Sequence, residues 1–416
     1  MNIGLLTTAT QLNYGATLQA MALREILSEL APNDAVETVN YDITPRREEL
    51  CGDPFWRLFR VWEKRTLKRL AVRFLCPDRM QAHRERRNRT LRFLQERVRI
   101  GRQVFHETSD LWNKNPYGLF VVGSDQVWRY QSRIHTFCLL SGITDPAVRR
   151  IAYAASLGWS KLPERFRAEF LPALERFDAI SVREPSAVAV LKDLLGESRD
   201  VRAVVDPTIL YGKDRWRLFL QESSPSVSVD GDYAFVYWLH DVEGLLPILK
   251  GLKNRGIRRV QIVFPCYMKL LEGDIFALKR TFSRLERDFG AEFRVDAGPV
   301  EFVHLLANAR YVVANSFHAM MFSLLFDKPA RIFVGLGKGR DLMAPRMISF
   351  AQRHGLGGVV FQGLDGHCDF PVEAAPDYGT VWQSIERDRA ASLDWLRAVL
   401  ADCGVRVAPP KPKGGI

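Results

Sequence analysis

A histidine follows a short apolar segment in the stretch Tyr311-Val-Val-Ala-Asn-Ser-Phe-His318. The apolar residues predict a buried strand, Tyr311–Ala314, that runs directly into an apolar helix capped by Asn315 or Ser316. His318 would then lie in the first helical turn, where the helix dipole disfavours a cationic imidazole. A neutral imidazole there can exchange protons near neutral pH, which makes His318 a candidate functional residue. A histidine buried only for packing is the alternative.

Polar side chains follow a second apolar segment, Leu119–Val122, in the stretch Gly123-Ser-Asp-Gln-Val-Trp-Arg129. Ser124, Asp125 and Gln126 supply a hydroxyl, a carboxylate and an amide in one turn after a strand. This combination is typical of a site for a polar ligand. The alternative is that Ser124 or Asp125 caps the next helix. Asn13 has the corresponding position after the predicted strand Ile3–Thr7, with a capping role as an equal alternative.

Three cations are candidates for binding an anion. Arg183 follows the predicted strand Ala179–Val182 at the start of a helix, where a cation needs an anion beside it. That anion could be Glu184, as a structural pair, or a ligand phosphate or carboxylate. Lys338 lies in a glycine-rich loop and Arg346 follows it, so both could close over an anion; the alternative is that they are solvated loop cations. The loop is not a P-loop, because Gly rather than Ser or Thr follows its Gly-Lys pair.

Strands and helices alternate along the chain, which predicts parallel sheets with helices on both faces. The fold class is therefore α/β, with two doubly wound Rossmann-like domains and a Ser-, Pro- and Gly-rich linker near residues 221–232. The predicted strands are Ile3–Thr7, Val36–Asn40, Leu119–Val122, Arg150–Ala154, Ala179–Val182, Ala203–Val205, Tyr233–Trp238, Val260–Phe264, Tyr311–Ala314 and Arg331–Val334.

The composition excludes several classes of protein. The 416 residues include 59 Lys+Arg and 48 Asp+Glu, a net charge of +11, and 47% are hydrophobic, which excludes wholesale disorder and coiled coils. We find no run of about 20 apolar residues, and the six cysteines show no zinc-ligand spacing. We expect no secretory signal, because the first 20 residues lack Lys and Arg and contain polar side chains. We expect a cytoplasmic protein with free thiols and a disordered tail at residues 407–416.

Residues 56–102 carry sixteen Arg/Lys and four Asp/Glu. We interpret them as a helical pair inserted in the first domain. The alternatives are a packed helix with a solvated basic face and a surface that docks on anionic lipid at the inner face of the membrane. Nucleic acid is not an expected partner, because no reading motif accompanies the basic residues.

Six short motifs, taken in order, resemble the polysaccharide pyruvyl transferase family over roughly residues 1–360. They are Asn13-Tyr-Gly-Ala-Thr-Leu-Gln19, Gly123-Ser-Asp-Gln-Val-Trp128, Tyr153-Ala-Ala-Ser-Leu-Gly158, Ser181-Val-Arg-Glu184, Asp206-Pro-Thr208 and Ser316-Phe-His318. The resemblance implies a GT-B-like fold: residues 1–210 on the acceptor side, with a helical insertion at about 53–105, and residues 211–400 on the donor side. The C-terminal helix, Tyr378–Leu400, would return to the first domain.

The resemblance also implies an activity. Pyruvate passes from phosphoenolpyruvate, a co-substrate, onto two hydroxyls of a sugar as a cyclic ketal during surface-polysaccharide assembly, and the acceptor can be lipid-linked. Neither a metal nor a further cofactor is needed. His318 would be the general acid/base and Arg183 a second catalytic residue. The donor would be bound by Arg183, Ser316, Lys338 and Arg346, and the acceptor by Asn13, Tyr14, Ser124, Asp125 and Gln126.

The sequence departs from the family pattern at Ser316, where relatives often have Arg, and at Asn315, where they often have an acidic residue. The donor must therefore be bound from elsewhere, or it is not phosphoenolpyruvate. Two other functions stay open: a GT-B-type glycosyltransferase that uses a nucleotide sugar, and a non-enzymatic binder of a glycan or an anionic membrane.

Overall fold

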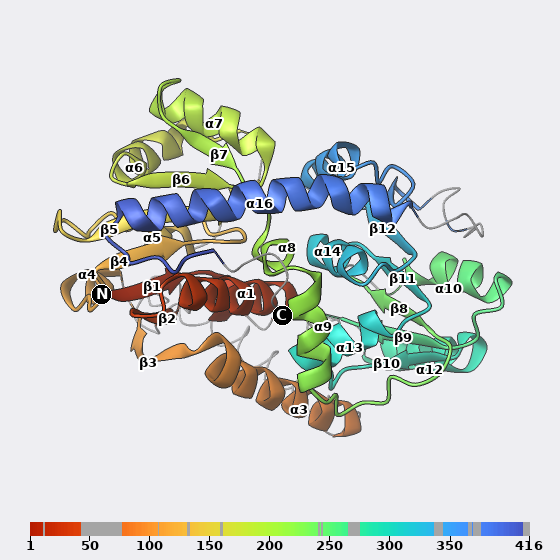
Figure 1. The fold of residues 1–416 in the computed structure, drawn as a ribbon. Helices are drawn as coiled ribbons and strands as arrows, with labels where there is room; N and C mark the ends of the chain where they lie inside the picture. The colour runs from red at the N-terminus through yellow and green to blue at the C-terminus, as the bar shows by residue number, and fades with distance from the viewer. Residues whose placement is uncertain are drawn as a thin grey trace. The chain divides into compact units, whose positions relative to one another are not determined.

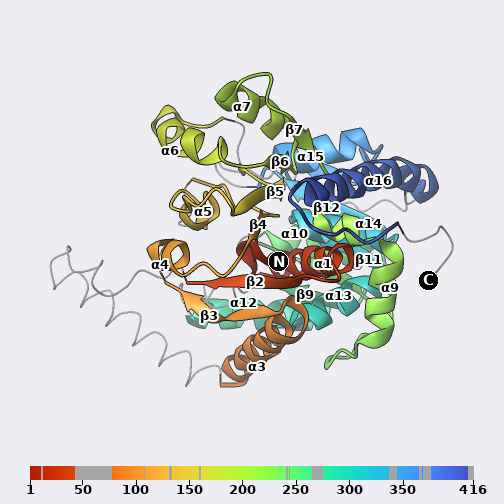
Figure 2. The same ribbon diagram turned by 60° about the vertical axis from the view of Figure 1, so that its left-hand side comes forward.

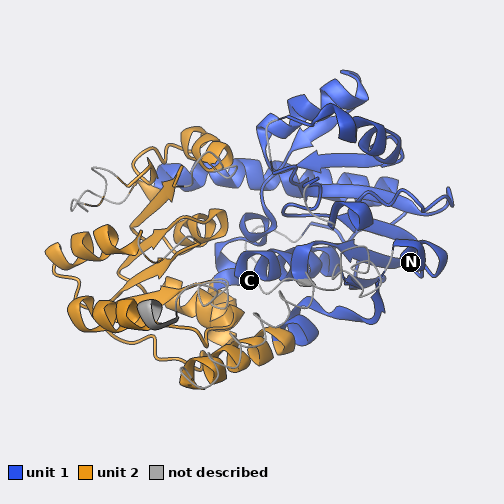
Figure 3. Cartoon of the chain, turned by 180° about the vertical axis from the view of Figure 1, so that it is seen from behind, with its two compact units in different colours: residues 1–43, 93–216, 379–416 blue, residues 44–92, 217–378 orange. Residues whose placement is uncertain are grey.

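The computed structural model describes residues 1–10, 13–42, 77–106, 108–130, 134–158, 161–239, 242, 244–264, 275–336, 344–364, 368 and 376–410. The chain divides into two compact units (Figure 3). Unit 1 comprises residues 1–43, 93–216 and 379–416, and unit 2 comprises residues 44–92 and 217–378. Each unit is built on one sheet (Figure 1).

Unit 1 contains a seven-stranded parallel sheet in the order β3-β2-β1-β4-β5-β6-β7. Its central strands are apolar on both faces; all four residues of β4, for example, are fully buried. The strands are β1 Asn2–Leu6, β2 Ala35–Tyr41, β3 Ile100–Phe105, β4 Leu119–Val122, β5 Arg149–Ala155, β6 Ala179–Val182 and β7 Val201–Ala203.

Helices cover both faces of this sheet. Along one face follow α4 Thr108–Asn113, α5 Ile134–Cys138, α6 Glu164–Leu174 and α7 Pro185–Leu195, and α1 Tyr14–Leu30 lies on the other (Figure 2). Phe120, Phe170 and Leu191 belong to the core on the first face. On the second face, the ring of Tyr153 contacts Trp395 of α16, Tyr378–Asp402, at 6.3 Å. The shorter α8, Pro207–Tyr211, packs on α1.

Unit 2 contains a six-stranded parallel sheet in the order β10-β9-β8-β11-β12-β13. The alternation of side chains along β8 shows its two faces. Ala234 and Val236 join the core beneath α10 and α12, whereas Phe235 and Tyr237 contact Phe302 of α13. The strands are β8 Ala234–Tyr237, β9 Val260–Val263, β10 Ala291–Phe293, β11 Tyr311–Ala314, β12 Ala330–Val334 and β13 Val360–Gln362.

The helices of unit 2 include one that precedes its sheet by more than a hundred residues. This helix, α3 Pro77–Phe93, is attached to unit 2 by Arg86, which is 2% exposed and donates to the carbonyl of Phe264 at 2.9 Å. Arg89 binds Asp296 at 3.1 Å. The other helices are α10 Leu245–Asn254, α12 Ile275–Phe289, α13 Pro299–Ala307, α14 Phe317–Leu325 and α15 Ala344–Arg353, while α9 Lys213–Glu222 spans the boundary between the units.

The doubly wound fold class is confirmed, and ten predicted strands have counterparts in the two sheets. The predicted strand Ala203–Val205 is wrong in position, because β7 ends at Ala203. Strands β3, β10 and β13 were not predicted. They lie at sheet edges, where few residues need to be apolar, so their sequences carry little strand signal.

The predicted insertion at about 53–105 is wrong in two respects. Residues 77–92 are helical but belong to unit 2, and Ile100–Phe105 is an edge strand of the first sheet. The first half of the insertion lies outside the described residues. Residues 379–416, with most of α16, belong to unit 1. No helix in the described ranges combines the length and apolar character needed to cross a membrane.

Candidate functional site

The carboxyl ends of β1 and β4 form the switch point of the first sheet, where the strand order reverses. Ligands of open parallel sheets bind at this point. Thr8, after β1, donates to Oδ2 of Asp125, after β4, at 2.9 Å. Gln19 of α1 donates to the hydroxyl of Thr7 at 2.6 Å, and Thr7 donates to the backbone of Ser124 at 3.3 Å. The two strand ends are therefore joined by polar side chains.

The guanidinium of Arg183, directly after β6, lies among three carboxylates. Its Nη1 donates to Oδ2 of Asp206 at 2.9 Å, its Nε to Oε1 of Glu184 at 3.2 Å, and its Nη2 to Oδ1 of Asp125 at 3.5 Å. The Arg183 side chain is 3% exposed. Because its edges point at protein carboxylates, the geometry favours the structural pairing with Glu184 over direct contact with a ligand anion.

The charge state of this cluster follows from its contacts. Burial alone would lower the pKa of Arg183, but the charges of Glu184, Asp206 and Asp125 outweigh burial and raise the pKa above its usual value. Arg183 therefore stays cationic and compensates the carboxylates. Asp206 also accepts bonds from the backbone N–H and the hydroxyl of Thr208, at 2.9 and 2.8 Å.

Asp125 is the most accessible carboxylate of the cluster. Its side chain is 14% exposed, against 8% for Glu184 and 1% for Asp206. Its backbone has φ 68°, and its carbonyl accepts from the N–H of Ser156 at 2.9 Å. Thr8 and Arg183 hold one carboxylate oxygen each. A carboxylate fixed in this way and open to solvent suits hydrogen bonding to a sugar hydroxyl.

The other predicted acceptor residues differ in accessibility. Ser124 is fully buried and donates to the carbonyl of Ala154 at 2.8 Å, so its hydroxyl supports the turn. Tyr14 is 2% exposed, as expected of a packed ring. Asn13 is exposed and caps α1 by accepting from the N–H of Gly15 at 3.1 Å, while Gln126 is half-buried beside Arg129. Only Asp125, Asn13 and Gln126 among these present a polar side chain to solvent.

The switch point of the second sheet lies at the ends of β8 and β11. Asn315, after β11, is 5% exposed, and its Oδ1 accepts from the N–H of Leu239, after β8, at 2.8 Å. Its Nδ2 has no hydrogen-bond acceptor among the residues that the structure describes. Asn315 therefore joins two strand ends and is not the N-cap.

Ser316 is the N-cap of α14, and its side chain accepts no hydrogen bond from the helix. His318 lies in the first turn and is 7% exposed, as predicted. The Phe317 ring packs on His318 at 5.5 Å and on Phe350 of α15 at 6.4 Å. Arg346, one turn before Phe350, is also buried, at 5% exposure. Lys338 lies outside the described residues.

Comparison with known proteins identifies the family. The sequence profile named polysaccharide pyruvyl transferase matches residues 13–335, most of the chain. The chain belongs to the polysaccharide pyruvyl transferase family. The matched range includes β4, the second switch point and His318, whereas β1 with Thr8, Arg346 and α16 lie outside it. Among curated proteins, no sequence matches significantly.

Solved structures agree on the fold. A UDP-N-acetylglucosamine 2-epimerase is 13% identical with a TM-score of 0.53, covering 100% of this chain and 99% of its own. A UDP-GlcNAc 2-epimerase from Neisseria meningitidis, bound to UDP-GlcNAc, is 10% identical with a TM-score of 0.50, covering 97% and 100%. These likenesses support a GT-B-like architecture of two Rossmann-like units for this member of the pyruvyl transferase family.

Thr8 and Ser156 were not predicted as site residues from the sequence. Thr8 holds Asp125, and Ser156 donates to Oε1 of Glu184 at 2.8 Å. Both are hydroxyl residues directly after apolar strands, which is the signal that identified Ser124 and Asp125. Among the described residues, no group of three or more His, Cys, Asp or Glu side chains is placed to hold a metal ion.

Replacing Arg183 by Met should destabilise unit 1 by about 3–5 kcal/mol, because three carboxylates would lose their common cation. Urea unfolding followed by tryptophan fluorescence measures this loss. Arg202→Met is the matched control: Arg202 is exposed and pairs with exposed Asp200, so this substitution should cost under about 1 kcal/mol. Adding Asp206→Asn to Arg183→Met should recover part of the loss. Equal effects of the Arg183 and Arg202 variants would contradict the cluster.

Replacing Gly123 by Ala should disturb the turn that carries Asp125. The new Cβ would lie 2.1 Å from the carbonyl oxygen of Tyr153, at a φ of +125°. Gly196→Ala is the control, because Gly196 also has positive φ, but no atom of the described residues would lie within 4 Å of the new Cβ. The control reports the backbone cost alone, about 1–3 kcal/mol, and Gly123→Ala should exceed it in thermal and urea unfolding. A similar loss of stability in both variants would contradict this prediction, because it would show that the turn shifts to accommodate the new Cβ.

Proposed function

We propose that this protein transfers pyruvate from phosphoenolpyruvate onto two hydroxyls of a sugar, forming a cyclic ketal on a surface polysaccharide or its lipid-linked precursor. The observation that carries the proposal is His318, nearly buried in the first turn of α14 at the switch point of the second sheet. Family membership supports a transferase with a sugar acceptor. Phosphoenolpyruvate and the ketal are the proposed part.

The proposed reaction adds one proton to carbon and removes two protons from sugar hydroxyls. A proton added to the methylene carbon of phosphoenolpyruvate makes a methyl group and a cationic C2. One sugar hydroxyl attacks C2 and loses its proton, the C2–O bond to phosphate breaks, and the second hydroxyl closes the ring and loses its proton. Two protons are released and one is taken up by carbon, so the other leaves with phosphate. One group that gives and takes protons serves both stages.

We assign this role to His318. An imidazole can donate to carbon and later accept from a hydroxyl without a permanent change in charge. Its place among Phe317 and the apolar residues of α14 keeps water away from the transferred proton. Arg183 acts at a distance from the reacting atoms, as a positioning residue that fixes Asp125.

The donor carries a phosphate and a carboxylate, which require cations or helix N-termini. In this proposal the first-turn N–H groups of α14 and the hydroxyl of Ser316 bind one anionic group of the donor. The Ser316 hydroxyl is suited to this role because it accepts no capping hydrogen bond from the helix. Arg346 supplies a buried guanidinium, and Lys338 a second cation. This arrangement would replace the Arg that relatives often have at position 316.

The acceptor sugar is assigned to Asp125, with Asn13 and Gln126. Asp125 can accept a hydrogen bond from one of the two reacting hydroxyls, since Thr8 and Arg183 fix its orientation. Ser124 and Tyr14 support this surface from the interior. The chemistry needs neither a metal nor an organic cofactor, because protonation alone activates the double bond.

Donor binding can be tested by thermal unfolding with phosphoenolpyruvate, with inorganic phosphate and a UDP-sugar as controls. We expect a selective rise with phosphoenolpyruvate, because a ligand that binds only the folded state stabilises it. Arg346→Met should reduce the rise, whereas Arg353→Met, at an exposed position of the same helix, should leave it. A rise with the UDP-sugar alone would contradict the proposal and favour a glycosyltransferase.

Catalysis can be tested by phosphate release from phosphoenolpyruvate with a panel of glycosides as acceptors. His318→Gln should keep the thermal response to phosphoenolpyruvate but lower turnover by about a hundredfold or more, because only proton transfer is lost. His304→Gln is the matched control, since His304 is equally buried, at 7% exposure, but its Nε2 forms a hydrogen bond with the hydroxyl of Ser223 at 3.0 Å. Unchanged turnover in the His318 variant would overturn its assignment.

A further inference from the structure

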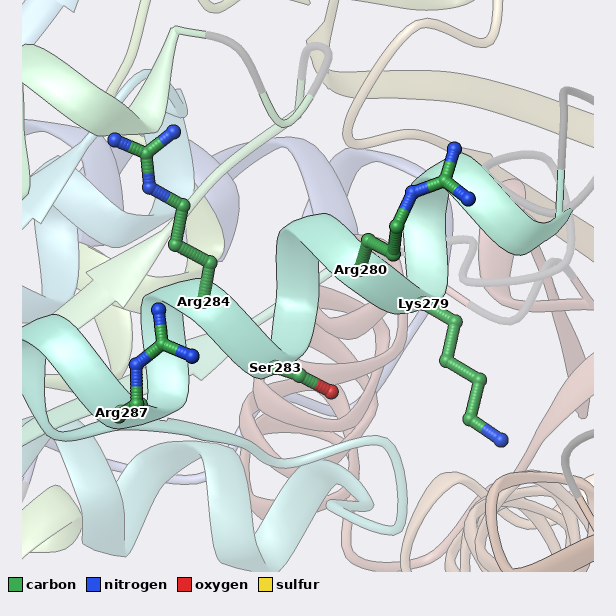
Figure 4. A pocket seen from close by; sticks show the side chains of 5 residues that line it. All are labelled: Lys279, Arg280, Ser283, Arg284 and Arg287. Carbon is green, nitrogen blue, oxygen red and sulfur yellow. The ribbon is translucent and has the colours of Figure 1, made fainter.

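Helix α12 of unit 2 presents a cationic face to solvent. Its opposite face is apolar: Phe282 and Leu285 are 1% and 2% exposed in the core of the unit. The exposed residues recur three and four positions apart, so they share one side of the helix. Together they line a shallow pocket of about 410 Å³ (Figure 4), formed by Lys279, Arg280, Ser283, Arg284 and Arg287.

The described carboxylates of α12 pair with arginines of α12 and α3. Asp288 pairs with Arg287 at 2.8 Å and with Arg284 at 3.5 Å. Glu286 is directed elsewhere, to Arg79 of α3 at 2.8 Å. Asp288 is thus shared by two of the four cations, and the long stems of Lys and Arg let the charged groups move toward an anion outside the helix.

Helix α3 adds cations beside α12. The guanidinium of Arg79 joins the two helices, since it pairs with Glu286 and lies over the Phe282 ring at 4.6 Å. The side of α3 that packs on unit 2 contains the buried Arg86. The exposed residues of α3 carry three cations and one carboxylate, and they include Leu91 at 40% exposure: Pro77, Asp78, Gln81, Arg84, Arg87, Asn88, Leu91 and Arg92.

We propose that the exposed faces of α12 and α3 are a docking surface for an anionic lipid bilayer. Lipid phosphates fit a shallow pocket lined by cations and a hydroxyl, and each Lys or Arg near an anionic membrane strengthens binding by about fivefold. Leu91 adds an apolar contact at the headgroup level. Single-stranded nucleic acid is less suited, because these two exposed faces carry no aromatic ring for base stacking in the described residues.

The surface goes beyond the proposed function, because membrane docking needs no reaction. Its basis is the four cations of α12 with the neighbouring arginines of α3, none of which we place in pyruvate transfer. Vesicle binding measured without phosphoenolpyruvate or acceptor therefore tests it separately. Failure of either proposal leaves the other intact.

Co-sedimentation of the full chain with vesicles provides the test. We expect binding to vesicles of phosphatidylcholine with about 30% phosphatidylglycerol, weak binding to phosphatidylcholine alone, and a decrease as salt rises from 0.1 to 0.5 M. The variant Lys279→Gln/Arg280→Gln/Arg284→Gln/Arg287→Gln should bind at least about tenfold more weakly. Arg84→Gln/Arg87→Gln should lose less.

The matched control removes the same charge from unit 1: Lys114→Gln/Lys161→Gln/Arg165→Gln/Arg202→Gln, all at exposed positions. It should bind like the wild type, and both variants should keep their unfolding midpoint within about 2 °C. Equal loss in the control would show that net charge alone attracts the protein to vesicles, which overturns the proposal. So would unchanged binding of the α12 variant, equal binding to neutral vesicles, or a stronger preference for RNA that the α12 variant abolishes.

Discussion

The ion cluster around Arg183 is the constraint on which the first unit depends. One buried guanidinium joins residues that follow β4, β6 and β7, through Asp125, Glu184 and Asp206. A buried ion cluster is stable only when its charges are matched and its remaining polar atoms are hydrogen-bonded. The contacts of Thr8, Ser156 and Thr208 meet this condition. The loops at this edge are therefore fixed without help from a ligand.

The two sheets join their neighbouring strand ends through different side chains. At each switch point, one side chain after a strand bonds to a residue after the neighbouring strand: Thr8 to Asp125 in unit 1, and Asn315 to Leu239 in unit 2. The first point presents a fixed carboxylate, which suits a neutral sugar. The second presents a helix N-terminus, which suits an anionic donor. This difference in charge is the physical reason for assigning the acceptor to unit 1 and the donor to unit 2.

The basic residues of α3 show why a charge count does not reveal a surface. Arg86 and Arg89 attach the helix to the rest of unit 2: Arg86 donates to the carbonyl of Phe264, and Arg89 pairs with Asp296. Arg84 and Arg87, on the same helix, face solvent. The cationic face of α12 was not singled out from the sequence, because its charges are spread over two helical turns and become a surface only when the opposite side is buried.

Local sequence patterns were enough to predict the family, the doubly wound class and the position of His318. Each depends on apolar strands followed by polar turns, and that pattern is contained within a single segment of the chain. The sequence left open whether Arg183 meets Glu184 or a ligand, and it placed Ser124 beside the acceptor. The tertiary structure decided both points: Arg183 is held by carboxylates up to 81 residues apart in sequence, and Ser124 is buried. Such contacts join segments from different strands, so local sequence patterns cannot predict them.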